Sequence, residues 1–395
     1  GGGVGGLSAG WKLDKAGFKD FLLLELESKV GGNSRSGRNA VSAYPLGAHY
    51  LPLPTREATA TRELLAELGV LQGDPRASRP RYDERYLCAT PQERLFRHGM
   101  WQEGLLPNAG VPAAEREQHR RFQDTVGRYR EQRDRQGKRA FAVPMELSSR
   151  DPELLALDRV TMRDWLLSQG FDSPTLHWYV DYTCRDDFGA GSEVVSAWAG
   201  IHYFACRDGE AEDAASDVVL TAPEGNAWLM RGLARRVEGR VQHGALVHRF
   251  HDNGREIEID VWLAGEQRSL RIVAQQAVWA APLYLLPHIW QGAAELKAAA
   301  KSYSHAPWLV ANLTLDHLPE ERAGAHLAWD NVLYGSPSLG YVVATHQQMR
   351  LRTGATVFTY YRAIADRSPS AGRELLPNTP REGRAEPILA HLSLP

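Results

Sequence analysis

Short apolar runs and amphipathic stretches alternate along the first part of the chain. Residues 21–24 form a continuous apolar run of strand length that ends at Glu25, which predicts a buried strand. A helix-compatible stretch at 7–15 precedes this run. Residues 56–72 carry apolar side chains at helical spacing, and Gly69 lies near the end of this stretch, which predicts a helix that ends at Gly69. A helix, a buried strand and another helix in this order indicate an α/β domain.

Longer helical patterns occupy the middle of the chain. Residues 113–136 are highly charged but carry one apolar stripe through Phe122 and Val126, which predicts an exposed helix with one buried face. Thr161 has the sequence of a helix N-cap and Gly170 that of a helix end. Residues 174–206 are rich in aromatic side chains and are expected to form the helices of a substrate domain.

Strand patterns fall into two groups. A first group, 245–250 and 256–261 around an Asp-Asn-Gly turn, predicts a β-hairpin. A second hairpin is expected from 86–89 and 94–96. Further strands are expected at 277–282, 308–315, 339–346 and 355–361, and the last three predict a mostly antiparallel sheet.

The glycines at the start of the chain form a G-x-G-x-x-G motif through Gly1, Gly3 and Gly6. Such a motif permits a tight turn, close approach of the backbone to a diphosphate, and tight packing of the helix on the strand. The N-terminus of the helix then offers N–H groups to the phosphates. Glu25 lies 19 residues after Gly6 at the end of the next strand, where an acidic side chain binds the ribose.

The segment after Glu25 narrows the prediction from a nucleotide to FAD. Residues 24–37, with Val-Gly-Gly at 30–32 and Arg35 nearby, resemble the flavoprotein group of amine oxidases, protoporphyrinogen oxidases and phytoene desaturases. Residues 45–51 are similar to the loop that this group places beside the flavin. Val247 and the Val-x-Ala-x-Pro pattern at 278–282 resemble later parts of the same flavin domain.

The resemblance implies FAD as cofactor and a small-molecule substrate. It implies the cofactor-binding residues Gly1, Gly3, Gly5, Gly6, Glu25, Leu26, Gly31, Gly32, Asn33, Arg35, Gly47, Ala48, His49, Tyr50 and Val247. His49 and Tyr50 are also the candidate catalytic residues, because a histidine in this loop hydrogen-bonds the flavin ring or shuttles a proton. The alternative is that the His49 ring packs and only its backbone touches the cofactor.

The expected fold is α/β. A Rossmann-like FAD-binding domain, residues 1–75 and 218–290, carries an inserted α+β substrate or cap domain of helices and an antiparallel sheet, residues 76–217 and 291–395. The glycine motif stands at the first residue without a preceding strand, so we expect the sequence to be a stretch of a longer polypeptide. The compartment therefore stays open between cytoplasm and export, and so does the oligomeric state.

Composition excludes several classes of function. Hydrophobic residues make up 43% of the chain, charged residues 24%, and the net charge is −2, which is typical of a soluble globular protein without affinity for nucleic acid. No apolar run approaches the roughly 18 residues of a membrane span. The three cysteines are scattered, and no histidine or cysteine pattern predicts a metal site.

Three functions are consistent with these residues. The first is an FAD-dependent oxidoreductase that oxidises a C–N or C–C bond of its substrate by hydride transfer to flavin. The second is a non-catalytic binding or assembly subunit with the same fold, because residues 306–312 lack the lysine that many amine oxidases place there. The third is an NAD-linked dehydrogenase, which shares the glycine motif but leaves Gly31 and Gly32 unexplained.

Overall fold

The computed structural model describes residues 1–290, 292, 294–348 and 354–393. Some positions of the predicted second domain (291, 293, 349–353, 394–395) lie outside the described residues. The chain divides into two compact units: unit 1 comprises 1–38, 45–49 and 224–305, and unit 2 comprises 39–44, 50–223 and 306–395. The domain boundaries expected from the sequence stay a prediction; the compact units place residues 50–75 with unit 2.

Unit 1 contains a parallel strand pair and two helices that contact each other. Strand β1 (Leu23–Leu24) pairs in parallel with β10 (Val241–Gln242). Helices α1 (Val4–Lys15) and α8 (Ala227–Arg236) pack on each other. A Cβ on Gly10 of α1 would lie 2.7 Å from a methyl group of Val237, so glycine lets the two helices approach closely. The helix and strand predicted here are confirmed.

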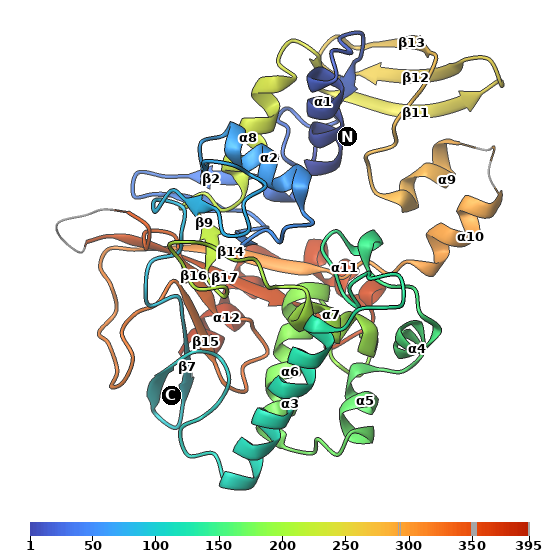
Figure 1. Ribbon diagram of the computed structural model, residues 1–395. Coiled ribbons are helices and arrows are strands. Elements are labelled where there is room, and N and C mark those ends of the chain that lie inside the picture. The colour runs from blue at the N-terminus through green and yellow to red at the C-terminus, as the bar shows by residue number, and fades with distance from the viewer. Residues whose placement is uncertain (291, 293, 349–353, 394–395) are drawn as a thin grey trace. The chain divides into compact units, whose positions relative to one another are not determined.

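Unit 1 also contains a three-stranded antiparallel sheet (Figure 1). It consists of β11 (Ala245–Asp252), β12 (Ile257–Leu263) and β13 (Arg268–Ala274), so the hairpin predicted at 245–261 is confirmed. The strand predicted at 277–282 is wrong, since these residues form no strand. Val278 is 71% exposed and Pro282 has no N–H to donate, so neither burial nor pairing favours a strand there.

The helices of unit 2 share one apolar core. They are α3 (Ala113–Glu131), α5 (Met162–Ser168), α6 (Pro174–Phe188) and α7 (Ala197–Ala205), shown in green in Figure 1. Phe122 and Val126 of α3 are fully buried, which confirms the predicted stripe. The Thr161 hydroxyl accepts a hydrogen bond from the Asp164 N–H at 3.1 Å and caps α5 as predicted.

A six-stranded sheet forms the rest of unit 2, in the order β14-β17-β16-β15-β7-β8. The strands are β7 (Glu93–Arg97), β8 (Met100–Glu103), β14 (Trp308–Leu315), β15 (Asp330–Leu333), β16 (Tyr341–Val343) and β17 (Thr356–Ala363). Neighbours are antiparallel except β15 and β7, which are parallel. The predicted mostly antiparallel sheet is confirmed.

The hairpin predicted from 86–89 and 94–96 is wrong. Strand β7 pairs instead with β8 across His98 and Gly99, which have φ of 53° and 79°. Two positive φ angles are those of a type I′ turn, the geometry that suits a two-residue hairpin. Within 86–89 only Leu87 makes an isolated bridge, to Leu220.

The remaining elements connect these layers. In unit 1 they are η1 (Gly32–Ser34), β2 (Ser36–Arg38), η4 (Leu283–Leu285), α9 (Leu286–Ile289) and α10 (Ala294–Ser302). Strand β3 (Ala43–Pro45) crosses the unit boundary. In unit 2 they are β4 (Tyr50–Pro52), α2 (Thr59–Glu67), β5 (Leu71–Gln72), β6 (Arg81–Tyr82), η2 (Met145–Leu147), α4 (Pro152–Ala156), η3 (Leu157–Arg159), β9 (Val219–Thr221), α11 (Pro369–Asn378) and α12 (Arg381–Leu392).

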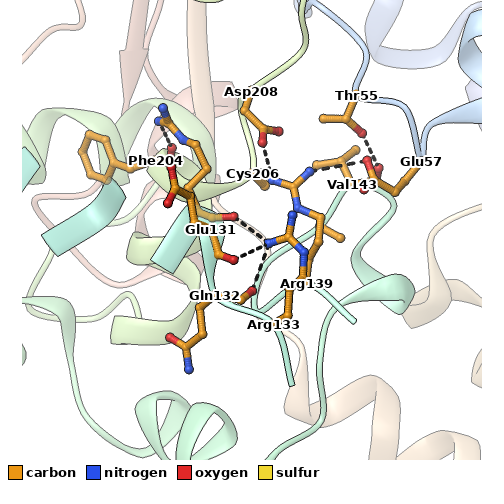
Figure 2. A network of polar contacts seen from close by, with 12 residues as sticks. Thr55, Glu57, Glu131, Gln132, Arg133, Arg139, Val143, Phe204, Cys206 and Asp208 are labelled. Atoms are coloured by element: carbon orange, nitrogen blue, oxygen red, sulfur yellow. Dashed lines mark hydrogen bonds and ion pairs between the residues drawn. The ribbon is translucent and has the colours of Figure 1, made fainter. Parts of the chain in front are cut away.

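Arg139 ties three loops of unit 2 together. Its guanidinium donates to Asp208 at 2.5 Å and to Glu57 at 3.4 Å, and only 8% of its side chain is exposed (Figure 2). A buried arginine is retained only where its charge is compensated, so this trio fixes the loops that carry Glu57 and Asp208. Across the described part of the chain, no helix has the length and apolar character needed to cross a membrane.

Candidate functional site

The N-terminus of α1 is open and lies among glycines. Gly3 is the N-cap, and the first hydrogen bond within the helix runs from the Leu7 N–H to the Gly3 carbonyl at 3.0 Å. The N–H groups before Leu7 therefore have no acceptor inside the helix. The first turn holds no acidic side chain, and Gly5 is exposed. The arrangement offers N–H donors and the positive end of the helix dipole to an anion.

Two glycine segments meet in front of this helix. The Gly31 N–H donates to the Gly2 carbonyl at 2.8 Å. A Cβ on Gly32, whose φ is 53°, would lie 3.1 Å from the Gly3 Cα, so any side chain there would press on the backbone of the first turn. The structure therefore brings the Val-Gly-Gly segment and the first glycine motif together, as a shared backbone cradle needs.

Glu25 projects from the end of β1 onto the first turn. Its carboxylate accepts hydrogen bonds from the Gly2 N–H and, at 2.8 Å, from the Glu27 N–H. Only 8% of the residue is exposed. Each carboxylate oxygen keeps a second lone pair, so the group has capacity left for a hydroxyl donor. Glu25 is thus held in place by backbone amides beside the open helix end.

The loop at 45–49 packs on the same segment. The Ala48 N–H donates to the Asn33 carbonyl at 3.0 Å, and the Leu46 N–H donates to the Arg35 carbonyl at 3.0 Å. A Cβ on Gly47 would lie 2.3 Å from the Asn33 oxygen, so only glycine fits there. The predicted residues Asn33, Arg35, Gly47 and Ala48 are therefore brought together, although they come from separate stretches of the sequence.

The Arg35 side chain lies over the glycine segment. Its Nε donates to the Gly32 carbonyl at 3.2 Å, and its Nη1 lies 3.6 Å from the Glu27 carboxylate. Both side chains of that pair are more than one third exposed, so the ion pair is weak and the guanidinium can turn to another anion.

Leu26 and Val247 are two further predicted residues. Leu26 is 57% exposed. Val247, on β11, packs its side chain with Leu24 and Val261 in the small core of the three-stranded sheet. The pairing of β11 with β12 shifts between Val247 and Arg249, which marks a bulge in the backbone at Val247.

His49 is half-buried at the end of the 45–49 loop. The Asn226 N–H donates to the Ala48 carbonyl at 3.0 Å, which anchors the loop to the start of α8. Burial lowers the pKa of His49 to about 4, so its imidazole is neutral near pH 7. A neutral imidazole acts as a hydrogen-bond partner and offers no fixed positive charge at this position.

Tyr50, the second candidate, belongs to a polar network of unit 2. Arg207 Nη1 donates to the Tyr50 oxygen at 3.1 Å, and the Tyr50 hydroxyl donates to Asp186 at 3.1 Å. The Tyr50 ring meets Trp329 edge to face at 6.1 Å, and Arg207 lies 3.9 Å from the centre of the Tyr203 ring. Burial raises the pKa of Tyr50, so its phenol stays protonated. Tyr50 thus acts as a donor to Asp186.

Carboxylates that sequence reasoning missed share this part of unit 2. Burial raises the pKa of Asp186 to about 6 and that of Glu93 to about 7. Burial also raises the pKa of Asp330, with nearby Glu93 and Asp186 acting in the same direction. Glu93 and Asp330 are register partners on the parallel strands β7 and β15, so their side chains leave the same face of the sheet. Repulsion within this set is relieved by protonation or by a bound cation.

Aromatic side chains surround the carboxylates. Tyr182 and Tyr361 are buried, and Trp178, Tyr179 and Trp308 pack with them. Trp178, Tyr179 and Tyr182 come from the aromatic-rich stretch 174–206, which the sequence assigns to a substrate domain, whereas a single acidic residue at the start of a strand does not predict a cluster of carboxylates. No group of three or more histidine, cysteine or acidic side chains able to hold a metal occurs within the described ranges.

Comparison with known proteins gives the fold. Residues 1–68 match the family of NAD(P)-binding Rossmann-like domains. An engineered putrescine oxidase is 15% identical with a TM-score of 0.69 (100% of this chain and 79% of that chain covered), and the cyclohexylamine oxidase of Brevibacterium oxydans is 14% identical with a TM-score of 0.62 (99% and 79%). The chain has the amine oxidase fold. A fatty acid isomerase from P. acnes also matches, at 15% identity and a TM-score of 0.56 (95% and 79%), so this fold spans several chemistries.

A search of curated proteins finds no match to the sequence, so the fold is inferred from the similarity to solved structures. What the fold implies for a cofactor is therefore tested on the residues themselves. Unit 1 offers open N–H donors at α1, a buried carboxylate at Glu25 and a close approach of two backbone segments that a Cβ at Gly32 would obstruct. These groups fit the diphosphate and ribose of a dinucleotide.

Proposed function

We propose that the chain binds FAD in unit 1 and is a flavin-dependent oxidoreductase. The observation that carries the proposal is the position of the Glu25 carboxylate, held by the Gly2 and Glu27 amides beside the open end of α1. A Rossmann-like cradle binds a dinucleotide through these two features. Bound flavin supplies an acceptor for a hydride from the substrate.

Each part of the cradle has a role in this proposal. The N–H groups at the start of α1 hold the diphosphate, and Glu25 accepts from a ribose hydroxyl. Arg35 turns from Glu27 toward a phosphate, because their ion pair at 3.6 Å is weak and exposed. The glycines predicted at the site supply close backbone, namely Gly1, Gly3, Gly5, Gly6, Gly31, Gly32 and Gly47, and Val247 supplies backbone beside the adenosine.

For the substrate we propose a cationic amine bound in unit 2. The support is the set of carboxylates Asp186, Glu93 and Asp330: burial raises the pKa of each, and neighbouring carboxylates raise these pKa values further, a repulsion that a bound cation relieves. An amine must lose a proton before a hydride leaves its α-carbon. Asp186, with a pKa of about 6, is charged at neutral pH and accepts that proton, while the Tyr50 hydroxyl holds the carboxylate in position.

The test is anaerobic mixing of the purified, flavin-loaded chain with amines, alcohols and polyenes while the flavin absorbance is followed. The proposal predicts rapid bleaching by an amine. Bound flavin that none of these compounds reduces would instead support the non-catalytic subunit. A chain that ignores FAD but forms a stable complex with NADH would support the dehydrogenase.

A further inference from the structure

Arg62 of helix α2 is buried in unit 2, with only 1% of the residue exposed. Its Nε donates to the Pro54 carbonyl at 3.1 Å, and its Nη1 donates to the carbonyls of Ala77 at 2.7 Å and Pro75 at 3.5 Å. Three of the five guanidinium N–H groups are thus used, and all three acceptors are neutral. The Nη2 atom is buried and has no hydrogen-bond partner among the described residues.

The positive charge of Arg62 is not balanced by a carboxylate in contact with it. Burial lowers the pKa of Arg62, and the carboxylates that act against this effect are Glu57 and Glu210. Glu57 is paired with Arg139 at 3.4 Å, and Glu210 is exposed. A guanidinium stays charged in a folded protein, and a buried charge is costly unless an opposite charge compensates it. Arg62 therefore differs from Arg139, which has two carboxylate partners.

A second buried donor without a partner belongs to the hairpin that Arg62 contacts. Tyr82 is 1% exposed and lies on β6, which pairs with β5, and β5 contacts α2. The Pro75 and Ala77 carbonyls that bind Arg62 belong to the loop between these two strands. Burial raises the pKa of Tyr82 to about 12, and Arg62 is the main charge that opposes this rise. The Tyr82 hydroxyl is buried and bonds to no group in the described part of the chain.

The two unused donors and the uncompensated charge call for a small anion. Asp213 does not supply it, because its carboxylate accepts from the Tyr82 backbone N–H at 3.3 Å and lies 3.7 Å from Arg81. A water molecule would accept both hydrogen bonds but leave the charge of Arg62 uncompensated. The cost of removing an ion from water rises steeply with its charge, so a buried site favours a singly charged ion over sulfate or phosphate.

We propose that Arg62 Nη2 and the Tyr82 hydroxyl bind a chloride ion inside unit 2. The ion accepts one hydrogen bond from each group and balances the charge of the guanidinium. Because Arg62 comes from α2 and Tyr82 from β6, the bound ion also joins the helix to the hairpin. Both residues belong to unit 2, and the inference stands whether or not the chain is an oxidoreductase.

The first test is the chlorine NMR line width of sodium chloride in the presence of the full chain. FAD is kept in excess in every sample, so that halide does not occupy the open end of α1. The wild-type chain should broaden the chloride line, and added bromide should reverse the broadening. Tyr82→Phe removes one hydrogen bond to an ion and should weaken chloride affinity roughly 10- to 100-fold. The matched control Tyr129→Phe, in the helical core of unit 2, should stay within about twofold.

A second measurement needs no variant. The unfolding midpoint of the wild-type chain should be higher in sodium chloride than in sodium gluconate at the same ionic strength, because an ion that binds only the folded chain stabilises it. This difference should shrink in Tyr82→Phe and persist in Tyr129→Phe. Equal midpoints in the two salts would mean that water alone occupies the site and would overturn the inference. Chloride broadening that bromide does not reverse, or equal chloride affinity of the wild-type chain and Tyr82→Phe, would overturn it as well.

Discussion

Replacing Glu25 by glutamine perturbs the cradle at a buried side chain that bonds to the first glycine turn. The carboxylate accepts from the Gly2 and Glu27 amides and, in our account, from a ribose hydroxyl. Glutamine has the same shape but only one acceptor oxygen, so its amide NH₂ must face one of these donors. Hydrogen bonds to a charged group contribute about 1.5–3 kcal/mol, and one is lost. FAD affinity should therefore fall roughly 10- to 100-fold.

The matched control is Glu27→Gln. Glu27 is two residues away, more than half exposed, and paired only at 3.6 Å with Arg35, so its loss should cost about 0–1 kcal/mol. The assay is a titration of cofactor-depleted chain with FAD, followed by the change in flavin fluorescence, with the unfolding midpoint measured on the same samples. Equal FAD affinity in the two variants would refute the role given to Glu25. A large loss in Glu27→Gln alone would refute it as well.

Three further predictions concern unit 2. Arg139→Met should lower the free energy of unfolding by about 3 kcal/mol, because Asp208 and Glu57 lose their cation (Figure 2). The control Arg120→Met, on the exposed face of α3, should change the free energy of unfolding by less than about 1 kcal/mol. Denaturant titrations that find equal effects for the two variants would contradict this prediction. Folding raises the pKa of Glu93 to about 7, so the folded chain binds the Glu93 proton more tightly than the unfolded chain. The contribution of Glu93 to the free energy of unfolding should therefore be greatest below about pH 4.3 and fall as the pH rises through 7. Glu93→Gln should flatten this fall in denaturant midpoints, and an unchanged slope would contradict the prediction. The Tyr50 hydroxyl donates to Asp186 and thereby favours its charged form, so Tyr50→Phe should raise the pKa of Asp186. The acid limb of the pH profile for flavin reduction should therefore move upward from about 6. A downward move would contradict this arrangement.

Local patterns predicted most of unit 1. The helix at 4–15, the strand that ends at Glu25 and the hairpin at 245–263 depend on neighbouring residues, and a glycine motif followed by an acidic residue constrains both spacing and geometry. The strand predicted at 277–282 is wrong because an apolar run does not by itself show burial, and Val278 is exposed. Burial of such a run is decided by distant parts of the chain, which periodicity does not reveal.

The carboxylates of unit 2 show where sequence reasoning ends. Glu93 and Asp330 become neighbours because β7 and β15 pair in parallel with a particular register. That register is set by the packing of one face of the sheet on α6, and one residue of slip would turn both side chains to the other face. Tyr50 was singled out for its place in a loop, but its partners Asp186 and Arg207 follow from the tertiary fold.

The central claim is that the chain holds a flavin dinucleotide in the cradle of Glu25 and α1. The most direct measurement is the stoichiometry and selectivity of dinucleotide binding to the purified chain by calorimetry. The account predicts one FAD per chain, not displaced by excess NADH, and a loss of that binding in Glu25→Gln. Binding of NADH in place of FAD, or FAD binding that is indifferent to Glu25, would contradict it.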